Sequence, residues 1–149
     1  MPVNEFCKLD VVCCEATTSI HEVAALMRIY HVGDVIVIGK NEQARVPIGI
    51  VTDRDIVIEA IAPQVDINIL TAGDIMSSSL ATVQENESLF GALRLMRTLK
   101  VRRMPVVRED GTLFGIITAD DMINMLAEEL STITEVLAGQ PAVESRTRR

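Results

Sequence analysis

The chain has 149 residues, of which 48% are hydrophobic, and its formal net charge at neutral pH is -7. The negative charge argues against general nucleic-acid binding, because contact with the phosphate backbone needs a net basic face. With one Tyr, three Phe and no Trp, the core must be built from aliphatic side chains and Met, which is ordinary for a compact α/β fold. No apolar run approaches the roughly 18 residues that span a bilayer, and the N-terminus lacks the basic and apolar segments of a signal peptide. We therefore expect a cytoplasmic protein without a membrane anchor.

The three cysteines, Cys7, Cys13 and Cys14, are odd in number and bunched near one end, unlike a disulfide framework. We expect reduced thiols. Adjacent residues on a strand point to opposite faces, so Cys13 and Cys14 are poorly placed to chelate one ion, and no His or Cys cluster completes a metal site. His21 and His31 have no Ser or Cys partner at a spacing typical of a hydrolase triad. The sequence thus predicts no metal site and no catalytic site, and we expect a protein that is not an enzyme.

The first half of the chain predicts the order strand, helix, strand, strand, helix. The first helix starts at Ser19, where Glu22 completes a capping-box pattern. Its expected core stripe is Val23, Leu26, Met27 and Tyr30. Pro63 marks the end of the second helix. The elements expected after the first helix are strands over 35–38 and 48–52, joined by a polar loop over 39–43, and a helix over 53–61; a short strand over 11–14 precedes them all.

The second half repeats this order. Sliding the sequence by 69 residues places Ser19, Leu26, Met27, Arg28, Val32 and Val37 on Ser88, Leu95, Met96, Arg97, Val101 and Val106. The expected elements are strands over 81–83, 104–107 and 113–118, a helix over 88–99 with core stripe Ala92, Leu95, Met96 and Leu99, and a helix from 120 to near 130. Residues 133–137 continue that helix or form another, and the tail after Gly139 is expected to be disordered. The sequence thus divides into a first repeat over 5–66, a second over 67–131 and a C-terminal extension over 132–149.

One heptapeptide occurs in both halves, as GIVTDRD at 49–55 and GIITADD at 115–121. In each copy an apolar β-branched run ends in a Thr that can cap a following helix, and an Asp falls three residues on. Asp is shorter than the Glu of a capping box, so we expect its carboxylate to face outward beside the helix N-terminus. Such a site suits a ligand that carries hydroxyls and phosphate, because the carboxylate accepts from a ribose diol and the helix N-terminus attracts the anion. The twin glycines are expected to let the backbone approach closely.

This repeated GhxTxxD pattern resembles the nucleotide-contacting motif of cystathionine β-synthase (CBS) domains, which occur as tandem pairs called Bateman modules. His31 to Asp34, Met104 to Val107 and Asp74 to Met76 agree with it, and the resemblance covers residues 5 to about 130. It implies an α/β (α+β) fold in which two βαββα repeats pack through their sheets with pseudo-twofold symmetry. A single βαββα unit leaves one sheet face uncovered, and pairing buries both faces. We expect two clefts, one beside each TxxD turn.

By resemblance, these clefts bind an adenine nucleotide. The predicted ribose contacts are Thr52, Asp55, Thr118 and Asp121. The predicted adenine slot comprises Cys13, Cys14, Val35, Ile36 and Val37 in the first repeat and Thr82, Val83, Met104, Pro105 and Val106 in the second. The predicted phosphate contacts are His31, Arg54, Lys100, Arg102 and Arg103. The alternatives are that the TxxD pairs only cap helices, that the slot residues are plain core, and that the cations are solvated.

We predict that the cleft beside Asp121 binds more tightly. The reason is that the second repeat has Arg102 and Arg103 where the first has Gly33 and Asp34, which gives it the more favourable charge for a phosphate.

Three functions follow as hypotheses. The first is a stand-alone regulatory module that senses AMP, ADP or ATP, with S-adenosylmethionine or NAD as alternatives, and acts on an unknown partner protein in trans. The second is a structural dimerisation module with no physiological ligand. The third and weakest is an enzyme that uses a bound nucleotide as its substrate.

We also expect a homodimer or larger assembly built on the long helices. Apolar residues outside the core stripes of the two long helices are Ala24, Ile29, Phe90 and Leu93. Leu126, Leu130, Ile133 and Leu137 recur at spacings of four, three and four, which if helical makes a narrow seam of the kind that helices use to pair. The alternative is that residues 126–137 fold back onto the repeats as core.

Overall fold

The computed structural model describes residues 1–39 and 44–147, with side chains described through Gly139. Residues 40–43 of the predicted polar loop lie outside this part. The first repeat contains β1 (Cys13–Glu15), α1 (Ile20–Tyr30), β2 (Asp34–Ile38), β3 (Pro47–Thr52) and α2 (Asp53–Ile56), which continues as the π-helical turn η2 (Val57–Ile61). The second contains β4 (Val83–Gln84), α4 (Leu89–Leu99), β5 (Arg103–Val107), β6 (Leu113–Thr118) and α5 (Ala119–Thr147). The short η1 (Val3–Glu5) and α3 (Ala72–Ile75) lie ahead of the two repeats. The predicted βαββα order is confirmed in both.

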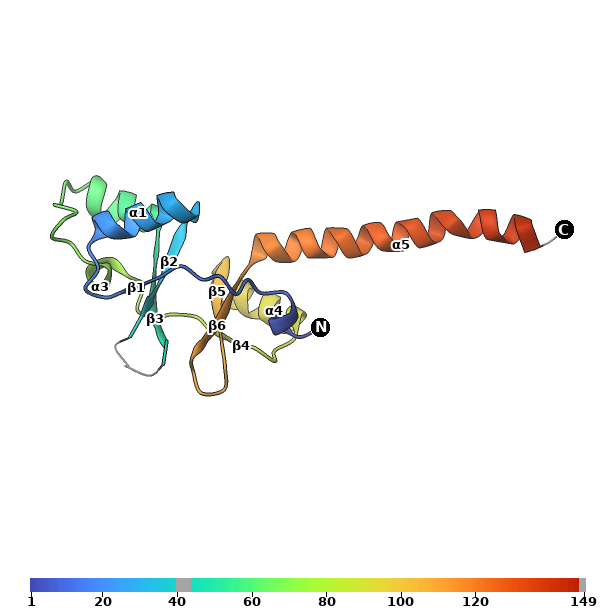
Figure 1. Cartoon of the computed structure of the whole chain (residues 1–149), viewed down its shortest axis with the longest axis horizontal. Helices are drawn as coiled ribbons and strands as arrows, with labels where there is room; N and C mark the ends of the chain where they lie inside the picture. The colour runs from blue at the N-terminus through green and yellow to red at the C-terminus, as the bar shows by residue number, and fades with distance from the viewer. Residues whose placement is uncertain (40–43, 148–149) are drawn as a thin grey trace.

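Each repeat forms a three-stranded sheet with the strands in sequence order (Figure 1). In both sheets the first strand runs parallel to the second and the second antiparallel to the third. Both sheets also shift register at equivalent places, between Val37 and Ile38 in one and between Val106 and Val107 in the other. The internal repeat of the sequence is thus preserved down to the irregularities of its strands.

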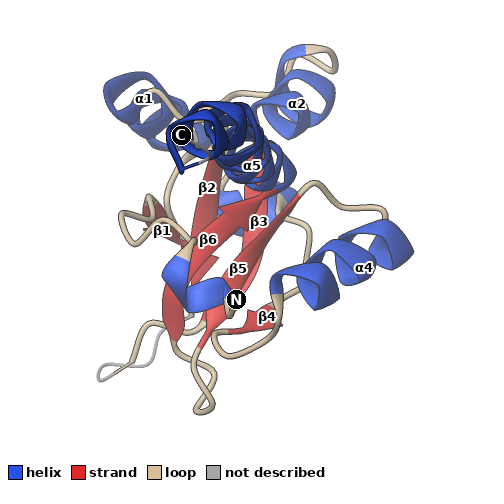
Figure 2. Cartoon of the chain, turned by 90° about the vertical axis from the view of Figure 1, so that its right-hand side faces the viewer, coloured by secondary structure: helices blue, strands red, loops and turns tan. Residues whose placement is uncertain are grey.

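The sheets pack against each other in the middle of the molecule, with α1 and α2 beside the first sheet and α4 beside the second (Figure 2). Side chains alternate along a strand, so Val35 and Val37 of β2 join the core under α1 while Ile36 faces the other sheet. There Ile36 clusters with Leu113 and Ile116 of β6. This shared cluster covers the open sheet faces and confirms the predicted packing of two repeats through their sheets.

The two long helices begin as predicted but bury shorter stripes. Ser19 and Glu22 form a complete capping box at α1, and the Ser88 hydroxyl accepts from the amide of Gly91 at α4. Tyr30 and Leu99, predicted as core, are exposed. Both are the last residues of their helices, where each side chain borders a surface pocket and not the sheet.

The segment that leads into each repeat packs on the other repeat. Val3 is fully buried in the second core, and Lys8 exchanges two backbone hydrogen bonds of 2.9 Å with Ile116 of β6. In the same way Ala72 is buried in the first core, and the amide of Ser77 donates to the carbonyl of Ile50 at 3.0 Å. Residues 67–76, which the sequence assigns to the second repeat, therefore pack on the first.

These crossings explain the glycine that opens each heptapeptide. A Cβ at Gly115 would lie 2.6 Å from the carbonyl oxygen of Lys8 and 2.8 Å from the sulfur of Cys7. A Cβ at Gly49 would collide with the side chain of Met76. The expectation that these glycines let the backbone approach closely is met at Gly115, where the approaching backbone is that of Lys8.

The last helix, α5, is a single helix from Ala119 to Thr147 that projects away from the two repeats (Figure 1). The sequence predicts disorder after Gly139, whereas α5 continues to Thr147. Leu126, Leu130 and Leu137 are exposed, so the alternative in which this stretch folds back as core is also wrong. Among the described helices, α5 included, none combines the length and the apolar character needed to span a bilayer.

Candidate functional site

The two TxxD turns have the same backbone but different carboxylate positions. At the first turn, Thr52 Oγ1 accepts from the amide of Asp55 at 3.1 Å, and Asp55 Oδ2 accepts from the amide of Thr52 at 2.9 Å. This is a capping box closed by Asp. The prediction that Asp55 faces outward is therefore wrong. The extended backbone of Thr52, with φ -103° and ψ 162°, presents its N–H to the helix, where the shorter Asp side chain reaches it.

At the second turn only half of this arrangement forms. Thr118 Oγ1 accepts from the amide of Asp121 at 3.1 Å, but the Asp121 carboxylate turns to Lys8, whose Nζ lies 3.2 Å from Oδ1. The other oxygen, Oδ2, is buried and has no hydrogen-bond partner among the described residues. A buried acceptor without a donor is unfavourable, and this oxygen is the one buried side-chain polar atom among the described residues that lacks a partner.

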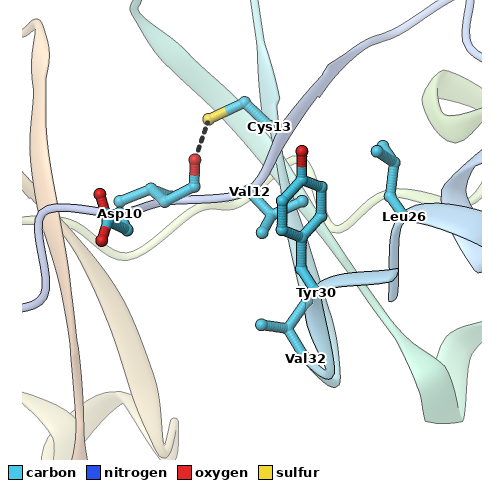
Figure 3. A pocket seen from close by; sticks show the side chains of 7 residues that line it. Asp10, Val12, Cys13, Leu26, Tyr30 and Val32 are labelled. Carbon is cyan, nitrogen blue, oxygen red and sulfur yellow. Dashed lines mark hydrogen bonds between the residues drawn. The ribbon is translucent and has the colours of Figure 1, made fainter. Parts of the chain in front are cut away.

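A pocket of about 500 Å³ opens beside the first repeat. Its walls come from β1 and the segment that leads into it, from the C-terminal half of α1 and from Val32, two residues before β2 (Figure 3). Apolar side chains and one aromatic ring surround it, with Asp10 at one edge, a composition typical of small-molecule sites. The lining residues are Asp10, Val11, Val12, Cys13, Leu26, Tyr30 and Val32.

This pocket adjoins a second cavity that reaches the other repeat. The smaller cavity, of about 90 Å³, shares Asp10, Val11, Val12 and Val32 with the pocket. Its remaining lining residues are Lys8, Asp34, Ile36, Ile116 and Thr118. We call the two together the Thr118 cleft. The sequence pairs each slot with the TxxD turn of its own repeat, whereas here the slot of the first repeat adjoins the turn of the second.

The second repeat has an equivalent pocket of about 510 Å³. It is lined by Ser78, Ser79, Leu80, Ala81, Leu99 and Val101. Ser79, Leu99 and Val101 stand 69 residues after Asp10, Tyr30 and Val32, so the two pockets are related by the internal repeat. We call this one the Leu99 pocket. It has an aliphatic wall where the Thr118 cleft has an aromatic ring.

The two arginines expected to favour one cleft are already paired with carboxylates. Arg103 Nη1 lies 3.1 Å from Asp34 Oδ1, and Arg102 Nη2 lies 3.5 Å from Asp120 Oδ1. Burial raises the pKa of Asp34, and the adjacent Arg103 guanidinium partly offsets that rise. Asp34 and Arg103 occupy equivalent positions of the two repeats and meet each other, so the charge argument that ranks the cleft beside Asp121 first no longer holds.

The sequence profile of the CBS domain matches the chain twice, at residues 3–61 and 72–128. The chain belongs to the CBS domain family. A CBS domain protein of Pyrobaculum aerophilum complexed with AMP has a similar structure, with a TM-score of 0.76, 26% identity and coverage of 89% of this chain and 99% of that one. An uncharacterised protein of Methanopyrus kandleri is 33% identical over 133 residues, which cover 89% of this chain but only 66% of that protein.

Hypoxic response protein 1 of Mycobacterium tuberculosis is 34% identical over 118 residues, which cover 79% of this chain and 80% of that protein. A crystal structure of hypoxic response protein I, with two coordinated zinc ions, has a TM-score of 0.73 at 30% identity and covers 83% of this chain and 98% of that one. In the part of this CBS pair that the structure describes, no group of three or more His, Cys, Asp or Glu side chains could hold a metal ion.

Most predicted slot residues lie in the cores of the CBS repeats. Cys13 lines the large pocket and Ile36 the small cavity. The predicted slot residues that lie in a core are Cys14, Val35, Val37, Val83, Met104 and Val106. Pro105 is buried outside these core clusters and Thr82 is partly buried.

The remaining predicted cations are exposed. Arg54 lies on α2, and His31 and Lys100 cap the C-termini of α1 and α4 in the left-handed conformation. Sequence reasoning missed the polar residues of the Thr118 cleft, Lys8, Asp10 and Asp34. The internal repeat contains a signal for Lys8. At the offset of 69 residues Lys8 aligns with Ser77, which directly follows the Asp74 to Met76 segment of the family resemblance.

The three cysteines are free thiols. Burial raises the pKa of all three, and that of Cys14 to about 11. Arg45 Nη2 lies 2.8 Å from Cys13 Sγ and lowers the pKa of Cys13 less than burial raises it. Since the thiolate is the reactive form, Cys13 at the edge of the pocket acts as an apolar lining residue.

Proposed function

We propose that this CBS pair is a regulatory module that binds an adenosine nucleotide in the Thr118 cleft and acts on a partner protein in trans. The observation that carries the proposal is the junction of an apolar pocket with a TxxD turn whose carboxylate is not used by its own helix. Asp121 Oδ2 is buried without a donor among the described residues, and Thr118 lines the cavity that continues the pocket.

The cleft offers a partner for each part of such a ligand. The adenine ring would lie against Tyr30, Leu26 and Val12, where an aromatic face gives favourable stacking. The ribose diol would donate to Asp121. Lys8 and the N-terminus of α5 would then attract the phosphate, as helix N-termini attract anions.

The AMP complex of the Pyrobaculum aerophilum relative supports an adenosine ligand. S-adenosylmethionine and NAD carry the same adenosine, so the chemistry of the cleft fits them as alternatives. We propose AMP, ADP or ATP first because the relative of similar structure is complexed with AMP and because the N-terminus of α5 favours a ligand with phosphate.

We propose weaker binding at the Leu99 pocket and the Thr52 turn. Asp55 there accepts from the amide of Thr52, so one carboxylate oxygen is already engaged. Leu99 also replaces the aromatic ring of Tyr30. The cleft beside Asp121 thus remains the tighter site, although for reasons that differ from the charge argument.

A ligand in the Thr118 cleft would touch both CBS repeats at once. The pocket belongs to the first repeat and Thr118 to the second, so occupancy would stabilise one arrangement of the two. A partner that prefers this arrangement would bind the loaded form more tightly. We place this signalling in the cytoplasm, where the three free cysteines would stay reduced.

Differential scanning fluorimetry and calorimetry with a ligand panel test the proposal. AMP, ADP, ATP, S-adenosylmethionine, NAD, GMP and CMP are each added at one common concentration, about 100 times the dissociation constant measured for AMP. Such a ligand stabilises the fold by about 2.7 kcal/mol, which raises the melting temperature by roughly 5 to 10 °C for a chain of this size. We expect this rise with adenosine ligands and a much smaller one with GMP and CMP.

The matched control is Asp120→Asn, which removes the same charge from an exposed carboxylate outside the cleft. It should keep the response, and Asp121→Asn should lose most of it. A flat response to the whole panel would refute ligand sensing and favour the structural dimerisation module.

A further inference from the structure

A further cavity, of about 680 Å³, is lined by residues of both CBS repeats. Strands β3 and β6 begin on the same side of the molecule, the lower side in Figure 1, and the cavity lies where they begin. It shares no lining residue with the Thr118 cleft or the Leu99 pocket. We call it the two-arginine pocket; the residues that define it are Leu9, Arg45, Arg108, Thr112, Leu113 and Phe114.

One arginine of the pocket comes from each repeat. Arg45 stands two residues before β3, and Arg108 directly follows β5. The three ion pairs found among the described residues include neither of them. The pocket has a single acidic lining residue, Asp110, so positive charge exceeds negative charge here although the chain as a whole has a net charge of -7. Such a pocket attracts anions.

Leu113 makes backbone hydrogen bonds to both arginines. Its N–H donates to the carbonyl of Arg45 at 2.7 Å, and its carbonyl accepts from Arg108 Nη1 at 2.9 Å. The guanidinium carbon of Arg108 also lies 5.1 Å from the centroid of the Phe114 ring, within the range of a cation–π contact. The Arg108 side chain is thus held in place before a ligand arrives, which reduces the entropy cost of binding.

The acidic residue of the pocket helps to position Arg108. Asp110 Oδ1 accepts from the amide of Thr112 at 2.9 Å and from its hydroxyl at 2.7 Å, and these bonds lower the pKa of Asp110. Arg108 Nη1 in turn donates to the Thr112 hydroxyl oxygen at 3.3 Å. Of the hydrogen bonds between described residues, those of the Arg108 guanidinium all use Nη1, and that of Arg45 uses Nη2 toward Cys13. Each arginine therefore has donors left for a ligand.

We propose that the two-arginine pocket binds a phosphate monoester with a small apolar group. Guanidinium groups bind phosphate through paired N–H···O bonds, and two of them match the two negative charges of a monoester. The apolar group would cover Phe114 and Leu9, which is 63% exposed, and so remove apolar surface from water. Because Arg45 and Arg108 belong to different repeats, the ligand would connect the two repeats at a place separate from the Thr118 cleft.

Isothermal titration calorimetry of the full chain with phenyl phosphate tests the proposal. The buffer is at about pH 7.5, where a monoester is dianionic, and contains about 0.15 M salt to screen nonspecific attraction. We expect saturable binding of one molecule per chain. Inorganic phosphate leaves Leu9 and Phe114 uncovered and should bind about 10-fold more weakly. Benzyl alcohol has a ring without a phosphate and should not bind.

Variants of the two arginines identify the site. Arg45→Gln and Arg108→Gln should each weaken phenyl phosphate binding by about 10-fold or more, because each loses charge-assisted hydrogen bonds. Arg94→Gln is the matched control, since it removes the same charge from an exposed position on α4 outside the described pockets. Tyr30→Leu changes the wall of the Thr118 cleft and should also leave the affinity unchanged. If Arg108→Gln lowers the melting temperature, Arg45→Gln decides the result.

Three results would overturn the proposal. The first is no binding of phenyl phosphate to the wild type, and the second is equal affinity for inorganic phosphate, which would make the pocket a site for the free ion. The third is a loss of affinity in Arg94→Gln or Tyr30→Leu as large as that in the arginine variants of the pocket. None of these titrations uses an adenosine ligand, so this site and the nucleotide site are tested separately.

Discussion

The heptapeptides at 49–55 and 115–121 fold into the same strand, Thr cap and helix start. The carboxylates of their last aspartates, however, have different partners. Asp55 accepts from the amide of Thr52 and closes its own cap. Asp121 leaves the corresponding amide and turns to Lys8. One copy is therefore a complete local structure, and in the other one carboxylate oxygen is buried without a donor among the described residues.

The difference comes from the segment that crosses each strand. Lys8 crosses beside Ile116, and Ser77, its equivalent 69 residues on, crosses beside Ile50. Lys8 brings a positive charge to Asp121, whereas Ser77 brings none to Asp55. A cation draws a carboxylate outward; without one the carboxylate satisfies its own helix N-terminus. A motif of seven residues thus takes its role from a residue far away in the sequence.

The largest effect should come from filling the glycine of each heptapeptide. Gly115→Ala forces a methyl group against the backbone carbonyl of Lys8, and the N–H and the carbonyl of Lys8 each make one hydrogen bond to Ile116 of β6. We expect it to destabilise the fold by about 3 kcal/mol and to lower the melting temperature by roughly 6 to 12 °C. Gly49→Ala meets the flexible side chain of Met76 and should cost only about 1 kcal/mol.

Gly139→Ala is the control for this pair, because Gly139 lies in α5 with open space around it. It should stabilise α5 by about 0.5 to 1 kcal/mol through helix propensity. Thermal unfolding of the three variants measures all of these effects. A larger loss at Gly49 than at Gly115 would contradict the view that a fixed backbone crosses Gly115.

Of the two aspartates, Asp121 should matter more for ligand binding and Asp55 more for the stability of the empty protein. Asp121→Ala should weaken AMP binding by about 10-fold or more, because a charge-assisted hydrogen bond is lost, and Asp55→Ala should weaken binding at that site far less. For the empty protein the order reverses. Asp55→Ala loses a helix cap worth about 1 kcal/mol, and Asp121→Ala stays within about 0.5 kcal/mol of wild type.

Calorimetry gives the affinities, and urea unfolding without nucleotide gives the stabilities. If Asp55→Ala and Asp121→Ala had equal effects in both measurements, the structural difference between the two turns would have no functional meaning.

The sequence predicts the two repeats and their element order because hydrophobic periodicity and helix caps are local signals. Ser19 with Glu22 and the GhxTxxD runs are examples. It does not predict which turn faces which pocket. That pairing depends on how the repeats dock, because Thr118 and Val12, which line the same cavity, lie far apart in the sequence. Predictions for single residues fail for a similar reason. Asp55 and Asp121 stand in the same sequence pattern, and only the segment that crosses each strand gives the two carboxylates different partners.

A smaller effect should follow from exchanging the wall residues of the two pockets. Tyr30→Leu gives the Thr118 cleft the wall of the Leu99 pocket and should weaken AMP binding about 5-fold, since aromatic contacts contribute about 0.5 to 1.5 kcal/mol beyond buried area. Leu99→Tyr is the matched exchange and should strengthen the weaker site by a similar factor. Both side chains are exposed, so the melting temperature without nucleotide should hardly change. Two-site calorimetry measures both factors, and an unchanged first affinity in Tyr30→Leu would remove Tyr30 from the site.

The smallest effect should come from the residues that end α1 and α4, and it should be the same in both repeats. His31 and Lys100 follow α1 and α4 in the left-handed conformation, with φ of 53° and 56°. The amides of the residues that follow them donate to the carbonyls of Met27 and Met96 at 3.1 and 3.0 Å, as in a helix end that usually carries Gly. Relief of the left-handed strain exceeds the extra chain entropy of Gly, so His31→Gly and Lys100→Gly should each stabilise the fold by about 0.5 kcal/mol.

Thermal unfolding measures the gain, and AMP titration of the same variants shows whether either cation contacts the phosphate. Equal gains with unchanged affinity would confine the asymmetry to the turns and their crossing segments, whereas a loss of affinity in His31→Gly alone would extend it to the end of α1.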